Sequence, residues 1–200
     1  MSISLASVKW TLTMGTVLTL AVLAMGACGD IVIEVVDEDA PTETRDDTFD
    51  IGPSARLVVS GFNGRIVVNG NSGETARVQA TLRWPDKIDY QVTRDGGTVT
   101  VKAEQKSRIA RTSGQSPGAD IEVTVPARTG VRLHTANGRI EVRNVQESGE
   151  VDTTNGKIVL LNVKGDFDAE TANGSIEVEG LEGTVVLKTT NGGITFAAEL

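Results

Sequence analysis

The sequence predicts an all-β protein whose C-terminal half is a parallel β-solenoid, a β-helix-like stack of 18-residue coils, preceded by irregular short β-strands. The main observation is a short phrase, Thr-x-Asn-Gly-x-Ile, that recurs every 18 residues between residues 131 and 196. A fixed period of this kind indicates a solenoid in which each repeat forms one coil. The composition agrees, because 22 glycines and only 4% aromatic residues are typical of a β protein with many tight turns.

Residues 1–27 have the pattern of an export signal. Lys9 supplies one positive charge, and residues 11–27 are apolar and uncharged up to Cys28, the only cysteine. The segment Met25-Gly26-Ala27-Cys28 resembles the lipobox of bacterial lipoproteins, which implies acylation of Cys28, palmitate included, and a lipid anchor in the bacterial cell envelope outside the cytoplasm. Two alternatives stay open: an uncleaved membrane anchor, and a soluble protein with an incidental cysteine.

An acidic tether, residues 28–47, is predicted to join this signal to the domain. Between residues 30 and 50, nine acids stand against Arg45 alone, which is typical of a solvated, extended spacer. Residues 31–36 are apolar enough to pair as an edge strand. From residue 51 onward the charge is nearly balanced, so the domain has no basic patch that would indicate a nucleic-acid partner.

The domain is predicted to span residues 48–200 and to open with short strands. Residues 75–82, 97–103 and 119–125 alternate apolar and polar side chains, as strands with one covered face do. A further phrase, Gly61-Phe62-Asn63-Gly64, has the same make as the repeats but lies outside their period. Residues 105–118 read as a long loop, which could bind a partner or be a tolerated insertion.

Alignment of the repeats gives two strands per coil joined at an Asn-Gly corner. Every second residue points inward, which stacks the apolar side chains and a column of threonines between coils. Each glycine is expected to allow the chain to reverse through a positive φ, and the asparagines to form a ladder of buried corner amides. The alternative is a row of asparagines that recognises a polar ligand such as a glycan. These structural turn residues are Asn137, Asn155, Asn173, Asn191, Gly138, Gly156, Gly174 and Gly192.

The outward columns carry charges of both signs, which favours pairing between adjacent coils on a solvated face. Asp152 and Glu170 would lie about 5 Å apart, the carboxylate separation of a retaining glycosidase. However, His134 is the only histidine, and no serine lies in a nucleophile motif. The sequence therefore predicts no catalytic residue, no metal site and no cofactor, with a carbohydrate-active β-helix enzyme as the less favoured alternative.

The repeated phrases, preceded by Asp120-Ile121-Glu122-Val123-Thr124-Val125-Pro126, resemble the DUF4097 family of bacterial β-strand repeat proteins, also labelled adhesins. The resemblance covers about residues 48–200 and implies a β-solenoid-like envelope protein without established binding residues. Two non-catalytic functions follow from it. One is a surface adhesin-like binding or structural module that contacts a glycan or protein, and the other is an envelope sensory or regulatory accessory that acts through a protein partner.

The last phrase leaves Ile194 and Phe196 without a following coil to cover them. Solenoids end with an atypical capping repeat, and the sequence shows no such cap up to Leu200. We therefore expect either further residues beyond Leu200 or a partner over this end. Self-association through the uncapped C-terminal coil is one form of that expectation.

Overall fold

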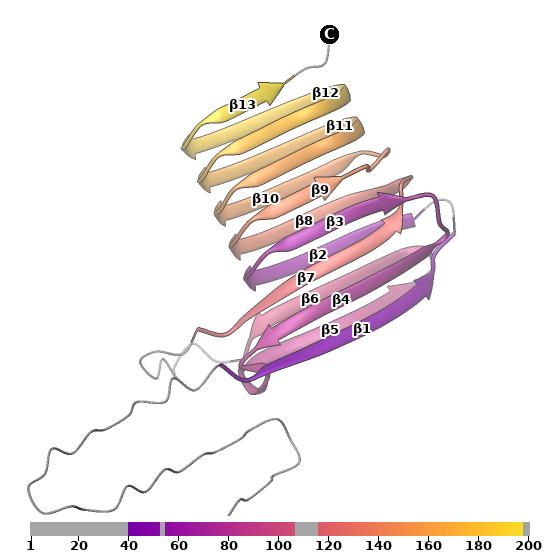
Figure 1. Ribbon diagram of the computed structural model, residues 1–200, viewed down its shortest axis with the longest axis vertical. Helices are drawn as coiled ribbons and strands as arrows, with labels where there is room; N and C mark the ends of the chain where they lie inside the picture. Colours follow the sequence, from indigo (N-terminus) through magenta and orange to yellow (C-terminus); the bar gives the residue numbers. More distant parts are fainter. Residues whose placement is uncertain (1–39, 53–54, 107–115, 198–200) are drawn as a thin grey trace, which may run out of the picture. The chain divides into compact units, whose positions relative to one another are not determined.

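The computed structural model describes residues 40–52, 55–106 and 116–197, which form an all-β domain (Figure 1). Its strands are β1 (Thr42–Asp50), β2 (Ala55–Asn63), β3 (Ile66–Asn71), β4 (Thr75–Arg83), β5 (Ile88–Asp95), β6 (Thr98–Gln105), β7 (Gly118–Pro126), β8 (Thr129–Asn137), β9 (Ile140–Arg143), β10 (Gly149–Asn155), β11 (Ile158–Asn173), β12 (Ile176–Asn191) and β13 (Ile194–Ala197). The only helical element among the described residues is a 3-10 turn at Pro85–Lys87. The all-β prediction is confirmed.

The strands join into one sheet that wraps around the core and nearly closes on itself. The strand order is β1-β4-β7-β3-β9-β11-β10-β8-β2-β6-β5. The sheet passes from one layer to the other at β11, because residues 158–161 of β11 pair with β9 and residues 167–173 pair with β10. One layer therefore holds β4, β7, β3 and β9, and the other holds β6, β2, β8 and β10 (Figure 1).

The sheet is mixed, so the prediction of a parallel solenoid does not describe the whole domain. β8, β10, β11, β12 and β13 pair in parallel with an offset of 18 residues, as the repeat predicts. In contrast, β1 pairs antiparallel with β4, β4 with β7, and β5 with β6. The strands predicted before the repeats at residues 75–82, 97–103 and 119–125 are present as β4, β6 and β7, but the sequence did not predict that β4–β7 and β5–β6 pair antiparallel.

The ordered domain also begins earlier than the predicted boundary at residue 48. β1 starts at Thr42, and all nine of its residues pair with β4, so residues 42–47 belong to the sheet and not to a tether. The rest of the predicted tether, with the strand-like residues 31–36, lies outside the described residues.

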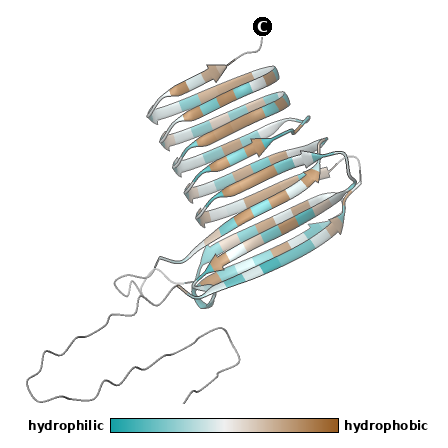
Figure 2. Ribbon diagram, in the orientation of Figure 1, coloured by the Kyte–Doolittle hydropathy of each residue, from teal (hydrophilic) through white to brown (hydrophobic). Residues whose placement is uncertain are grey.

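The core lies between the two layers and is built almost entirely from Val, Ile, Leu and Ala. Apolar and polar residues alternate along each strand (Figure 2), so one face of each strand is buried. Each coil adds several aliphatic side chains, and burying each one contributes roughly 1.5–3 kcal/mol. The isoleucines after the corner form one such column, Ile66, Ile140, Ile158 and Ile176, and all are at most 1% exposed.

Candidate functional site

The asparagine side chains of the repeats form one hydrogen-bonded row along a corner of the stack. In each step the Nδ2 of one asparagine donates to the Oδ1 of the asparagine in the preceding coil, at 2.8–2.9 Å. This asparagine row consists of Asn63, Asn137, Asn155, Asn173 and Asn191. The amides of the four repeats are exposed, so the expectation of buried corner amides is wrong.

Asn63 is a member of the row that the period did not identify. It is 74 residues from Asn137 in the chain, yet the two residues are register partners of β2 and β8. Its own Nδ2 donates to the carbonyl of Pro117 at 3.1 Å. The sequence signal for Asn63 is the phrase Gly61-Phe62-Asn63-Gly64, which resembles the repeats. It lies outside their 18-residue period, so the period alone does not place Asn63 in the row.

The glycines of the corner are required by close contact between coils. A Cβ on Gly156 would lie 1.8 Å from the carbonyl oxygen of Gly138, and a Cβ on Gly174 would lie 1.9 Å from that of Gly156. Among the four predicted corner glycines only Gly138 has a positive φ, 147°. The predicted reason, a reversal through positive φ, is therefore wrong for the other three, whose role is to let the next backbone approach.

Three inward threonines donate hydrogen bonds to backbone carbonyls of the preceding coil at the same corner. The hydroxyl of Thr171 donates to the carbonyl of Gly156 at 3.0 Å, and that of Thr189 donates to the carbonyl of Gly174 at 2.9 Å. Thr153 makes the equivalent but longer contact with Gly138 at 3.4 Å. Thr135, whose register partner in β2 is Gly61, is also buried, but its hydroxyl has no hydrogen-bond partner among the described residues.

The outward side chains of β8, β10, β11 and β12 form a mixed-charge surface, called here the charged face. Register places its members in two rows across the coils, Arg132, Glu150, Asp168 and Val186 in one, and His134, Asp152, Glu170 and Lys188 in the other. Arg132 pairs with Glu150, and His134 pairs with Asp152. Lys188 lies 4.0 Å from a carboxylate oxygen of Asp168 and 3.8 Å from one of Glu170.

An open hollow of about 420 Å³ lies on this charged face. Its lining residues are Glu150, Val151, Asp152, Thr153, Thr154, Asp168, Glu170 and Ala172. All four carboxylates of the charged face therefore converge on it. Asp168 and Glu170 share one ammonium group at the limit of ion-pair distance, so this hollow has a surplus of negative charge.

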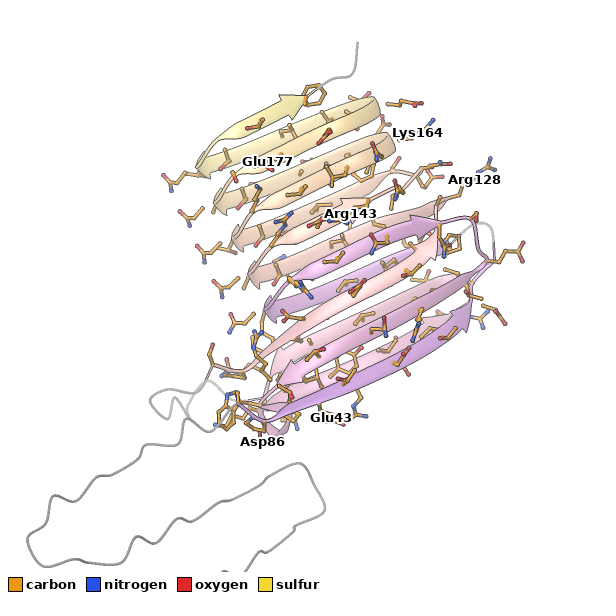
Figure 3. The ribbon with its side chains drawn as sticks, viewed as in Figure 1. Glu43, Asp86, Arg128, Arg143, Lys164 and Glu177 are labelled. Carbon is orange, nitrogen blue, oxygen red and sulfur yellow. The ribbon has the colours of Figure 1, made fainter. Side chains whose placement is uncertain are left out.

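The opposite outward surface carries a tighter ion cluster that sequence reasoning did not identify. Glu141, on β9, has a side chain only 7% exposed and pairs with both Arg139 and Arg143. On neighbouring coils Lys157 pairs with Glu177, and Lys164 with Glu182. Figure 3 shows Arg143, Lys164 and Glu177 on successive coils of the stack. Since Glu141, Glu177 and Glu182 are all paired, these residues form closed ion pairs and not an open site.

The lipidation residue Cys28 and the export signal lie outside the described residues, as do residues 107–115 of the predicted loop. Within the part of the chain that the structure describes, no helix is long and apolar enough to cross a membrane. The same residues contain no group of three or more His, Cys, Asp or Glu side chains that could hold a metal ion.

Comparisons with known proteins are remote. No protein-family model matches the chain, the DUF4097 family included, and no curated protein matches it. Among solved structures, a "putative cell adhesion protein" from Clostridium sporogenes has 12% identity and a TM-score of 0.41, covering 78% of this chain and 100% of its own.

A "putative adhesin" from Bacteroides fragilis has 12% identity and a TM-score of 0.31, covering 80% of this chain and 98% of its own. A "putative lipid binding protein" from Parabacteroides distasonis has 11% identity and a TM-score of 0.30, with coverages of 79% and 95%.

Proposed function

We propose that this chain is a non-catalytic module of the cell envelope that binds a polar partner, glycan or protein, in the manner of an adhesin. The observation that carries the proposal is the charged face, where four carboxylates converge on one open hollow. Carboxylates accept hydrogen bonds from hydroxyl and ammonium groups, so the hollow suits a partner rich in such donors.

The scaffold beneath the charged face supports a binding role. The strands that carry it are joined in register over four coils, and their inward residues Leu133, Val151 and Ala169 are fully buried. We interpret β2, β3 and β8–β13 as a β-solenoid of stacked coils, with the antiparallel strands as its N-terminal cover. Such a stack holds outward side chains at a fixed spacing of about 4.8 Å. A repeating polar surface on rigid strands is fitted to an extended partner.

The test is a binding screen with a matched control. Purified chain is applied to a glycan array and used in a pull-down from solubilised envelope proteins. Asp168→Asn with Glu170→Gln removes two charges from the hollow without changing side-chain size. Glu122→Gln with Glu179→Gln removes two exposed charges from the opposite surface. We expect the first pair to lose binding and the control pair to keep it.

The outcome also separates the candidate functions. Binding to the glycan array supports the adhesin-like module. Capture of an envelope protein supports the sensory or regulatory accessory, provided that the capture is lost in the Asp168→Asn, Glu170→Gln variant. New reducing ends after incubation with cell-wall polysaccharides would contradict the non-catalytic proposal and favour a carbohydrate-active enzyme. Equal binding by both variant pairs would show that the hollow is not the binding surface.

The envelope location is a separate part of the proposal and rests on residues 11–28. We expect the protein in the membrane fraction, with Cys28 acylated as the first residue of the mature chain. Mass spectrometry of the purified protein checks this. Cys28→Ser is expected to abolish acylation, and an unmodified Cys28 with residues 1–27 still attached would contradict the lipid anchor.

A further inference from the structure

Two backbone edges are free at the β13 end of the described stack. β13 pairs only with residues 176–179 of β12. The second half of β12, residues 184–191, pairs with β11 on one side and with no described strand on the other. Both edges present backbone N–H and C=O groups in the geometry that a further strand would satisfy.

The side chains at this end continue the core columns into solvent. Ile194 and Phe196 are register partners of Ile176 and Val178, which are fully buried, yet they are 46% and 48% exposed. On the other layer, Val185 and Leu187 continue the columns of Phe167 and Ala169 and are only half-buried. Among the described residues, no side chain covers the apolar core at this end.

The two ends of the stack are protected differently. At the far end β1 carries five charged residues, and Arg45 and Asp47 lie close enough to the Tyr90 hydroxyl to influence its pKa. Charged residues on an edge strand are a usual protection against pairing with another chain. β13 carries no charge, and residues 184–191 carry only Lys188. The β13 end thus lacks the protection that the β1 end has.

The open end has the shape of a step, one strand high. β13 covers the first half of β12 in one layer, while residues 184–191 in the other layer have no strand above them (Figure 1). Consider a second copy related to the first by a twofold axis that is parallel to the strands and lies at this end. The rotation reverses the stacking direction of the second copy and exchanges the positions of its two layers. The β13 of each copy then lies on residues 184–191 of the other, and the paired strands run antiparallel.

We propose that a second copy of this chain occupies the open end, so that two copies join through their β13 ends and complete each other's last coil. The step is self-complementary, and its pairing closes both free edges at once. It also brings Ile194 and Phe196 of one copy over the open core of the other. Because the interface is isologous, it closes at a dimer and does not grow into a filament.

Sedimentation equilibrium of the full chain, in density-matched detergent, tests the proposal. We expect a dimer for the unmodified chain and a monomer for Phe196→Asp, because the new carboxylate would be buried in the joint core without a partner. Ile194→Lys is a second, independent disruption of the same edge. Thr93→Asp, an exposed residue of β5 near the opposite end, is the control and is expected to remain dimeric.

Far-UV circular dichroism and the melting temperature establish that each variant is folded, and at least one disrupting variant is expected to fold because both residues are half exposed. A monomeric unmodified chain would overturn the proposal. So would a dimer that persists in both folded variants, since another surface would then hold it. Species that grow beyond a dimer with concentration would indicate head-to-tail stacking and would overturn it as well.

Discussion

The glycine after each asparagine lies so close to the backbone of the neighbouring strand that no side chain fits there. The Gly156 Cα faces the carbonyl oxygen of Gly138 so closely that an added methyl group would sit 1.8 Å from it. The obstacle is backbone and not a movable side chain, so the coils would have to separate locally. Gly193 is also part of a corner phrase, but an added methyl there meets no atom within 4 Å.

Gly156→Ala is therefore expected to lower the free energy of unfolding by about 1–3 kcal/mol, as overpacking of a tight site does. The matched control Gly193→Ala is expected to change it by less than about 0.5 kcal/mol. Urea unfolding followed by circular dichroism measures both. If both variants lower the free energy of unfolding by similar amounts, glycine is needed at this corner for its conformational freedom and not for the close contact between coils.

The threonine column offers a second comparison between residues of the same type. Thr171→Val removes a hydrogen bond to the carbonyl of Gly156 and is expected to lower the free energy of unfolding by about 1 kcal/mol. Thr135→Val removes a buried hydroxyl that has no partner among the described residues, and it is expected to leave the free energy of unfolding unchanged or raised. Thermal melting of the two variants checks this, and a larger loss for Thr135→Val would contradict the assignment.

At the scale of the element, the sequence predicts what repeats and fails where the chain departs from the repeat. The strands β8, β10, β11 and β12 follow the period because each coil must place its apolar residues over those of the last. The position of β2 beside β8 could not be read from the period, because 74 residues separate Asn63 from Asn137. Alternation alone identifies β4, β6 and β7 as strands but carries no information about the partner or direction of each strand.

The candidate site was predictable only in part for the same reason. The columns of His134, Asp152 and Glu170 follow from adding 18, and the register confirms that these residues are neighbours. The ion pairs of Glu141 with Arg139, which directly precedes β9, and with Arg143 were not identified from the sequence. Alternation places Arg139, Glu141 and Arg143 on one face, but only the packed structure shows that long side chains cover the carboxylate.

The β1–β5 end of the domain gives an element-scale prediction about pH. Burial, together with the nearby Asp47 carboxylate, raises the pKa of Tyr90 from 10.0 to about 12, although Arg45 opposes the shift. A raised pKa means that the folded state favours the neutral phenol. The stabilising contribution is therefore complete below pH 10 and is lost as the pH rises from 10 toward 12.

Tyr90→Phe removes this dependence and, because the hydroxyl has no described protein partner, is expected to leave stability near pH 7 unchanged. Urea unfolding of both proteins between pH 8 and the start of alkaline unfolding measures the difference. The unmodified protein should lose stability relative to Tyr90→Phe as the pH rises above about 10. Parallel curves would show that Tyr90 titrates as an exposed phenol.

At the scale of the whole molecule, the stack makes stability depend on position. Each coil contacts only its neighbours, so a strand at the end opens without disturbing the rest. β8 lies between β2 and β10, and its inward residues Leu133 and Thr135 are fully buried. All described residues of β13, in contrast, are exposed and have one neighbouring strand.

Amide hydrogen exchange should follow this gradient along the stack. In the Phe196→Asp variant, which we expect to be monomeric, exchange should be slowest in β8 and β10 and fastest in β13 and residues 184–191 of β12. In the unmodified chain the last two segments should exchange more slowly, since the second copy would pair with their free edges. The amides of β1 should exchange alike in both proteins, because the opposite end takes no part in the contact. Uniform rates from β8 to β13 in the variant would contradict opening from the end, because they would make the stack a single cooperative unit.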